Sequence, residues 1–212
     1  GADMHMYPGT DEAWVERNSD NRFPNWGRRG SRIAQGAGWA QASSTPFRLF
    51  KAFIAEGGIR SPLIASGPPL ARSGKTLHAI AHVMDIAPTL LEIAAATYPT
   101  ANESGVPIPQ RGKSLLPLLT AQADSTRGAD DFLAWEFFDW RAVRTAKWKA
   151  TWIAEPFGTG DWQLFDMMVD PGESMNLSDQ FPDVTQELAK KWHRYADDVG
   201  VVPSEATNWP DN

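Results

Sequence analysis

The clearest candidate for chemistry in this sequence is a lysine that stands shortly before a pair of glycines. Lys51 precedes Glu56 by five residues, and Gly57 and Gly58 follow directly. Because glycine has no Cβ, such a pair lets the backbone come close to another group. A flexible ammonium beside this bend suits an anionic oxygen and can neutralise charge that develops on it. On the residues alone, Lys51 is either an anion contact or a surface lysine over a tight turn.

Two further residues are candidates for contact with an anionic substrate. Arg60 follows the glycine pair, where it can hold a second anionic oxygen or form a structural ion pair with Glu56 or another carboxylate. His5 lies in a polar N-terminal stretch that we expect to be a functional loop, which makes it a candidate for the substrate pocket.

The sequence offers no convincing set of metal ligands. Asp166, Asp170 and Glu173 are close together, as carboxylates around a hard cation are. However, the Asp-Pro-Gly that begins at Asp170 is typical of a turn whose carboxylate binds its own backbone, and we favour that interpretation. His78 and His82 stand four residues apart, but no third ligand accompanies them. We therefore predict no metal site within this chain.

The first half of the chain is expected to hold few regular elements. Residues 1–45 show no lasting period and predict a long ordered loop. Residues 46–54 predict a short strand or extended turn, and residues 63–65 a short buried strand that ends at Gly67. An amphipathic helix is predicted over residues 86–96, with Asp85 as its N-cap. Its apolar face consists of Val83, Ile86, Leu90, Ile93 and Ala94.

The second half predicts a small α+β lobe. Short aromatic-rich runs separated by turn residues indicate an antiparallel meander over residues 132–138, 141–145, 148–153 and 162–165. An amphipathic helix then covers one face of this meander. Its apolar positions are Val184, Leu188, Trp192, Tyr195 and Val199.

Composition excludes several classes of function. The net charge of −6 over 212 residues argues against nucleic acid or an anionic membrane as a partner. No apolar run approaches the eighteen or so residues that a membrane helix needs, and the first residues do not look like a signal peptide. The absence of cysteine excludes disulfides, thiolate zinc sites and cysteine nucleophiles from the chain.

Three segments, taken in order and spacing, resemble the sulfatase family of the alkaline-phosphatase superfamily. The first is Lys51-x-x-x-x-Glu56-Gly57-Gly58-x-Arg60-x-Pro62. The second is Met84-Asp85-Ile86-Ala87-Pro88-Thr89-Leu90-Leu91-Glu92-Ile93-Ala94. The third combines Trp148-Lys149, Leu164-Phe165-Asp166 and Asp170-Pro171-Gly172-Glu173-Ser174-Met175-Asn176-Leu177. The resemblance extends from about residue 40 to residue 202, and the tail is similar to that of bacterial arylsulfatases.

The resemblance implies an α/β parent fold and an activity. Residues 1–125 would be the end of the large catalytic α/β domain, and residues 126–212 a small α+β lobe with an antiparallel sheet and a C-terminal helix. The parent enzyme would hydrolyse sulfate monoesters, aryl sulfates in particular. By resemblance Lys51 contacts the sulfate and helps to neutralise the leaving oxygen, and the region around Asp85 is scaffold.

The resemblance also implies that parts of the active site lie elsewhere. Sulfatases use a formylglycine, made from the Cys or Ser of a Cys/Ser-x-Pro-x-Arg motif, and a divalent ion, usually Ca²⁺, held by upstream Asp and Asn residues. Ser44-Thr45-Pro46-Phe47-Arg48 fits the short motif, but it runs directly into Lys51 and Glu56 rather than the expected Leu-Thr-Gly, so we reject Ser44 as the nucleophile. Gly1-Ala2 resembles the residues just after the Asp-Asn ligands, which we expect immediately upstream.

The partners expected from this resemblance are a sulfate ester and the N-terminal part of the sulfatase. Alone the chain is expected to be inactive, and apolar surface left open for that part would favour self-association, such as a homo-oligomer. Two alternatives stay open: a phosphonate or phosphodiester hydrolase of the same superfamily, and a non-catalytic interaction lobe. The sequence does not fix the compartment, which for a bacterial sulfatase would be periplasm or cytoplasm.

Overall fold

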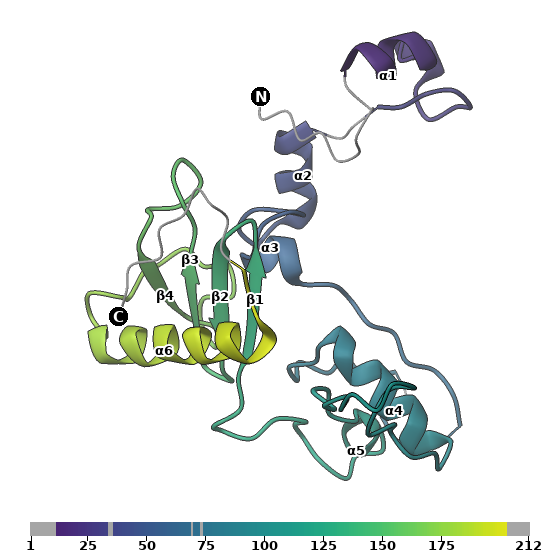
Figure 1. The fold of residues 1–212 in the computed structure, drawn as a ribbon. Coiled ribbons are helices and arrows are strands. Elements are labelled where there is room, and N and C mark those ends of the chain that lie inside the picture. Colours follow the sequence, from purple (N-terminus) through teal and green to yellow (C-terminus); the bar gives the residue numbers. More distant parts are fainter. Residues whose placement is uncertain (1–11, 34–35, 69, 73, 203–212) are drawn as a thin grey trace.

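The computed structural model describes residues 12–33, 36–68, 70–72 and 74–202. Figure 1 shows a sheet covered by a long C-terminal helix, a pair of N-terminal helices leading away from it, and a helical region joined to it by extended connections. The helices are α1 (Glu12–Asn18), η1 (Phe23–Asn25), α2 (Gly36–Ser44), α3 (Glu56–Ile59), η2 (Val83–Asp85), α4 (Ile86–Ile93), α5 (Leu116–Leu119) and α6 (Pro182–Val199), and the strands are β1 (Leu133–Phe137), β2 (Trp140–Arg144), β3 (Trp148–Trp152) and β4 (Trp162–Asp166).

The four strands form an antiparallel meander in the order β1-β2-β3-β4, as the aromatic-rich runs predicted. The register aligns Ala134, Val143, Ala150 and Leu164 in one row across the sheet. Because side chains alternate between the two faces of a strand, this row defines one face. Leu188, Trp192 and Ala196 of α6 pack on it, which confirms the predicted cover by the tail helix.

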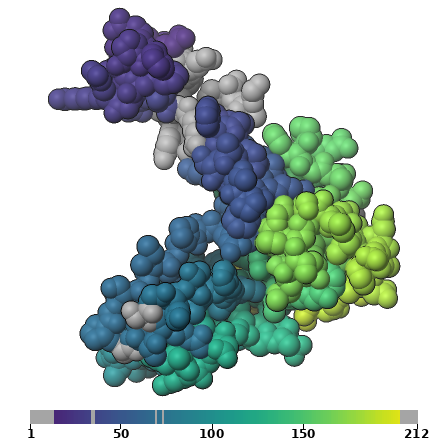
Figure 2. Space-filling view, turned by 180° about the vertical axis from the view of Figure 1, so that it is seen from behind, coloured from purple at the N-terminus to yellow at the C-terminus, as the bar shows by residue number. Residues whose placement is uncertain are grey.

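The opposite face of the sheet is covered by residues 48–60, which we call the lysine turn because they include Lys51. Ile54 and Ala55 from this turn form a second core with Ala142 of β2 and Ile153, which follows β3. α6, the sheet and the lysine turn therefore lie in three successive layers. Figure 2 shows the α4–α5 region as a separate mass beside these layers.

Predictions for the first half of the chain were partly wrong. Residues 12–18 and 36–44 are helical rather than loop. Residues 46–54 form turns and bends, so of the two forms predicted for them the turn is present and the strand is not. Residues 63–65 are not a buried strand: the side chains of Leu63 and Ile64 are 57% and 91% exposed. A strand needs a neighbour for its hydrogen bonds, and the sheet of the described residues contains only β1 to β4.

The helix predicted from residue 86 exists as α4, but its surroundings differ from expectation. Val83, Leu90 and Ile93 of its predicted apolar face are exposed in this structure. Asp85 is the N-cap residue of α4, as predicted, although its side chain makes no capping hydrogen bond to that helix. The Asp85 carboxylate is fully buried and binds the Arg127 guanidinium through two 2.8 Å hydrogen bonds, because an apolar site tolerates such a charge only when it is paired.

Within the described ranges, no helix is both long and apolar enough to cross a bilayer.

Candidate functional site around the lysine turn

The backbone of the lysine turn folds back on itself around Lys51. Gly57 N–H donates to the Arg48 carbonyl at 3.0 Å, and Phe53 N–H donates to the Phe50 carbonyl at 3.0 Å. Leu49 and Ala52 adopt positive φ angles of 60° and 83°, which bend the chain sharply on both sides of Lys51. The Lys51 side chain lies at the exposed tip of this bend.

The glycine pair is required by close packing, not by unusual backbone angles. Both glycines lie in α3, and neither has a positive φ. A Cβ on Gly57 would lie 2.0 Å from the Leu49 carbonyl oxygen, and one on Gly58 would lie 2.0 Å from the Phe53 carbonyl oxygen. The prediction that this pair brings backbone close to another group is confirmed, and that group is the turn that holds Lys51.

A fully buried ammonium lies beneath the lysine turn. Lys149 projects from β3 on the side away from α6, with a side-chain exposure of 0%. Its Nζ lies 3.0 Å from Glu56 Oε1 and 2.7 Å from Glu173 Oε1. Glu173 Oε2 in turn accepts a hydrogen bond from Glu56 N–H at 3.0 Å. These three residues close a ring of charge-assisted contacts.

Two arginines complete this arrangement, which we call the charge cluster: Arg48, Glu56, Arg144, Lys149 and Glu173. Arg144 Nη1 lies 2.9 Å from Glu56 Oε1, and Arg48 Nε lies 3.7 Å from Glu173 Oε2. Burial alone would raise the pKa of Glu56, but the positive charges of Lys149 and Arg144 outweigh burial and lower it below its ordinary value of 4.5. Glu56 is therefore ionised at neutral pH.

Arg48 also ties the start of the lysine turn to the sheet. Its guanidinium donates to Gln163 Oε1 at 3.2 Å and to Thr151 Oγ1 at 3.5 Å. It lies 5.2 Å from the centre of the Phe165 ring, within the range of a cation–π contact. Gln163, Thr151 and Phe165 share the face of the sheet that carries Lys149.

The predicted site residues have different positions. Arg60 Nη1 lies 3.8 Å from Glu56 Oε2, and its guanidinium lies 4.4 Å from the centre of the Phe47 ring. The structural pair with Glu56 is thus present, although 44% of the Arg60 side chain remains exposed. His5 lies outside the described residues. The contacts of Lys51 and Arg60 with a substrate stay predictions.

The turn after β4 agrees with its prediction at Asp170 and differs from it at Glu173. The Asp170 carboxylate accepts the backbone N–H groups of Ser174 and Met175 at 2.9 and 2.8 Å, so it is a turn residue. Glu173 is not: it has a φ of 55° and points its carboxylate into the charge cluster. A left-handed conformation is unfavourable for glutamate, and the pairing with Lys149 gives a physical reason for it here.

The described part of the chain contains no group of three or more His, Asp or Glu side chains that could hold a metal ion. His78 and His82 share no helix, since His82 precedes η2 and its Nδ1 accepts the Met84 N–H at 3.3 Å. Ser44 ends α2, where its hydroxyl donates to the Ala40 carbonyl at 3.0 Å. That the metal ligands lie upstream of this chain stays a prediction.

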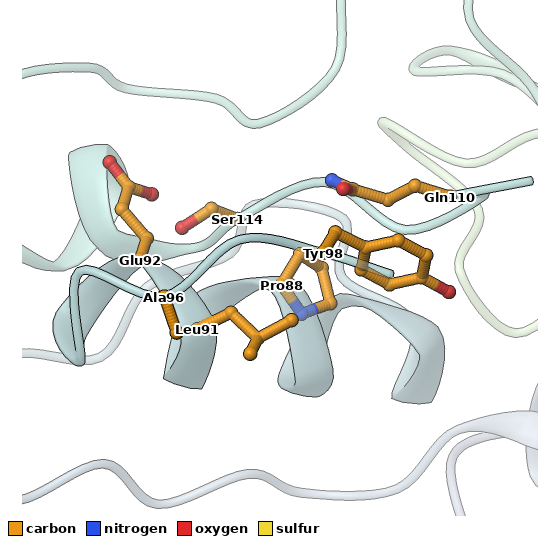
Figure 3. A pocket seen from close by; sticks show the side chains of 7 residues that line it. All are labelled: Pro88, Leu91, Glu92, Ala96, Tyr98, Gln110 and Ser114. Atoms are coloured by element: carbon orange, nitrogen blue, oxygen red, sulfur yellow. The ribbon is translucent and has the colours of Figure 1, made fainter. Parts of the chain in front are cut away.

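A pocket of about 250 Å³ lies beside α4, away from the residues proposed for anion binding. Figure 3 shows Pro88 and Leu91 on the helix and Tyr98, Gln110 and Ser114 on the segments across from it. Glu92 is the one charged residue among those that line it, and neither Lys51 nor Arg60 takes part. A pocket without a cation is unsuited to a sulfate group, so the candidate site remains at the lysine turn.

Comparisons with known proteins identify the family of this chain. The family model described as N-sulphoglucosamine sulphohydrolase, C-terminal, matches residues 47–198, a range that begins with the lysine turn and includes the whole charge cluster. The chain therefore belongs to the sulfatase family, as a C-terminal portion.

Curated relatives carry the same family name. The chain is 38% identical over 185 residues to an uncharacterized sulfatase of Schizosaccharomyces pombe, covering 86% of this chain and 33% of that protein. It is 36% identical over 123 residues to an arylsulfatase of Klebsiella aerogenes, covering 57% of this chain and 26% of that one. The chain thus spans about a third or less of the length of these relatives.

The crystal structure of Ps i-CgsB shares the fold. It has a TM-score of 0.57 and 21% identity, and the match covers 72% of this chain and 32% of that one. The fold is consistent with the end of an α/β parent fold that carries a small lobe with an antiparallel sheet and a C-terminal helix.

Lys149 and Glu173 were missed as site residues by the sequence analysis. Both stand in the segments that carry the family resemblance, and that shared position was the available signal. Nothing in either segment alone shows that the two side chains meet.

Proposed function

We propose that this chain supplies one side of the active site of a sulfate monoester hydrolase that acts on aryl sulfates. Lys51 is the catalytic and substrate-binding residue, and Arg60 is a second substrate contact. The observation that supports this most is an exposed ammonium at the tip of a turn whose backbone is fixed by a packed glycine pair and a buried charge cluster.

The chemistry suits an ammonium at this place. Cleavage of the sulfur–oxygen bond of a sulfate ester leaves negative charge on the departing oxygen. A cation held in position before the reaction stabilises that charge without reorganisation. Lys51 can meet this requirement because the bends at Leu49 and Ala52 and the contacts of Glu56 restrict the backbone that carries it.

Ca²⁺ and a formylglycine, which the family resemblance implies, do not fit the residues described in this chain. The described part holds no cluster of acidic or histidine ligands, and the chain has no cysteine. Ser44 uses its hydroxyl within α2. We assign both groups to the N-terminal part of the sulfatase, and Lys51 acts on a sulfate held there.

Exposed large apolar residues support the need for that part. Ile64, Val83, Leu90 and Ile93 are each more than half exposed, from two segments separated along the chain. Soluble proteins seldom leave a large apolar patch open, and such patches usually mark an interface. The sulfatase portion that the relatives have and this chain does not span is the proposed cover, with residues 1–125 forming the end of the catalytic domain.

The test uses a fusion of the N-terminal portion of the Klebsiella aerogenes arylsulfatase to this chain, assayed with p-nitrophenyl sulfate. Lys51→Ala is expected to lower kcat/KM about 100-fold or more, the usual loss for a group that stabilises a developing oxyanion. Lys190→Ala, an exposed lysine of α6, is the matched control and should leave kcat/KM unchanged.

Four outcomes would contradict the proposal in different ways. An active fusion in which Lys51→Ala has full activity would remove Lys51 from the site. Faster turnover of an aryl phosphonate than of the sulfate would assign the chain to the phosphonate and phosphodiester hydrolases. Turnover by the 212-residue chain alone would refute the assignment of the missing groups to another part, and a folded but inactive fusion would favour a non-catalytic lobe.

A further inference from the structure

We propose that Lys149 is a positioning residue for Lys51, acting through Glu56 and Glu173. This inference rests on the proposed function, because it concerns the same reaction. Lys149 cannot contact the substrate itself, because its side chain is fully buried beneath the lysine turn.

The contacts of Lys149 join three separate segments. One carboxylate, Glu56, begins α3 at the end of the bend that contains Lys51. The other, Glu173, comes from the turn after β4. Since Lys149 itself lies on β3, a single ammonium attaches the lysine turn and the β4 turn to the sheet.

Glu173 holds the lysine turn at both ends. Its Oε2 accepts the Glu56 N–H at 3.0 Å, which fixes the backbone after Lys51. The same oxygen lies 3.7 Å from Arg48 Nε, before Lys51. Lys51 stands three positions after Arg48 and five positions before Glu56, so the backbone that carries Lys51 has little freedom between these two anchored points.

The orientation of Glu173 depends on Lys149. Both carboxylates are almost completely buried, and Glu56 keeps Arg144 at 2.9 Å if Lys149 is removed. Glu173 would keep only the longer contact with Arg48 as an ionic partner among those described. A buried carboxylate without a close cation either takes up a proton or turns towards water. Rotation releases the Glu56 N–H, and protonation leaves it a weaker, neutral acceptor, so either change loosens the end of the lysine turn.

Hydrogen exchange on the 212-residue chain tests the structural half of this inference. In Lys149→Met, which replaces the ammonium with an apolar group of similar length, the amides of residues 56–60 should exchange at least about tenfold faster. Glu173→Gln keeps an oxygen for the Glu56 N–H but loses the charge, so it should show a smaller increase in the same amides. This milder variant serves if Lys149→Met fails to fold.

Arg127→Met is the matched control. It removes a buried cation from an ion pair with Asp85 in the α4 region, away from the lysine turn. It should leave exchange at residues 56–60 unchanged. Equal acceleration in Arg127→Met and Lys149→Met, or none in both Lys149 and Glu173 variants, would overturn the inference.

Kinetics of the fusion enzyme test the catalytic half. A displacement of about 1 Å can lower a rate about 100-fold, so Lys149→Met should reduce kcat by a factor of this order, per folded molecule, while KM changes less than about threefold. Lys149→Met combined with Lys51→Ala should be no slower than Lys51→Ala alone, because both changes affect one group. A purely structural role would lower the yield of folded enzyme and leave kcat per folded molecule intact, which would refute positioning.

The two proposals fail in different ways. If the fusion without substitutions hydrolyses no sulfate ester, the proposed function fails, whereas exchange at residues 56–60 still decides whether Lys149 holds the lysine turn. A different result separates them the other way: an active fusion in which Lys51→Ala is slow but Lys149→Met has an unchanged kcat. In that case the proposed function stands and the positioning inference fails.

Discussion

Arg127→Met should be one of the most destabilising single substitutions in the α4 region. The guanidinium of Arg127 makes two hydrogen bonds of 2.8 Å to the two oxygens of Asp85, whose side chain is fully buried. The Asp85 carboxylate also accepts the backbone N–H groups of His82 at 2.8 Å and Lys113 at 2.9 Å. Removing the cation leaves a buried negative charge with two neutral donors, which typically costs about 3–5 kcal/mol.

The measurement is the free energy of unfolding in urea, followed by far-UV circular dichroism. With a slope of about 2 kcal/mol per molar urea, a loss of 3–5 kcal/mol lowers the midpoint by about 1.5–2.5 M. Arg72→Met is the control: Arg72 pairs with Asp124 at 2.6 Å, but the Asp124 side chain is 95% exposed. That surface pair should contribute less than about 1 kcal/mol.

The free energy of unfolding at acid pH tests whether the ionised Asp85 carboxylate is the cause. Burial would raise the pKa of Asp85, but the hydrogen bonds from Arg127 and the two backbone groups lower it below its ordinary value of 3.8. A lowered carboxylate pKa stabilises the fold above pH 3.8, and this stabilisation is lost as the pH falls through the folded value. Equal midpoint shifts for Arg127→Met and Arg72→Met would refute the reasoning, as would an Asp85→Asn/Arg127→Met double variant no more stable than Arg127→Met alone.

Three further predictions concern single residues. Burial lowers the pKa of His82 from 6.5, opposed in part by Asp85. The free energy of unfolding should therefore decrease as the pH falls below 6.5. Urea titrations at several pH values should show that His82→Gln loses this dependence. Gly57→Ala should unfold at a markedly lower urea concentration than Gly38→Ala. The added Cβ would lie 2.0 Å from the Leu49 carbonyl oxygen at position 57, whereas at position 38 it would meet open space outside its own helix. Leu90→Glu, on the exposed apolar side of α4, should reduce self-association in sedimentation velocity.

Each of these three predictions would be refuted by one specific result. A flat pH dependence between 6.5 and 5 for the native chain would refute the first. Equal urea midpoints for the two glycine variants would refute the second. A native chain that is monomeric at all concentrations would refute the third.

The second half of the fold was predictable because its signals are local. Trp148, Ala150 and Trp152 alternate with Lys149 and Thr151 along β3, and this alternation marks two faces of a strand. The apolar spacing of Leu188, Trp192 and Tyr195 likewise marks one side of α6. A short meander followed by one helix then has few ways to close its core.

The burial of Lys149 was not predictable from its strand. Alternation assigns Lys149 to the face opposite α6, and a charged residue there normally indicates contact with water. That face is instead covered by Ile54 and Ala55, residues almost a hundred positions earlier. Local periodicity carries no information about which distant segment supplies such a cover.

The same limit explains the errors in the first half. Leu63 and Ile64 have strand-like composition, yet strand formation depends on a partner, and the described sheet offers none to them. Asp85 holds the N-cap position that was predicted for it, but its carboxylate binds the distant Arg127 instead of the first turn of α4. Glu173 follows a correctly predicted turn at Asp170, and only the meeting with Lys149 shows its role.

The charge cluster also sets an order of assembly during translation. Lys149 follows Glu56 by 93 residues, and Glu173 follows Glu56 by 117 residues. At about 5–20 residues per second, the ribosome needs roughly 6–23 s after adding Glu56 before it adds Glu173. The lysine turn of the nascent polypeptide therefore lacks its second carboxylate until Glu173 has been added, and a message truncated before that codon yields a product whose lysine turn is never anchored by Glu173.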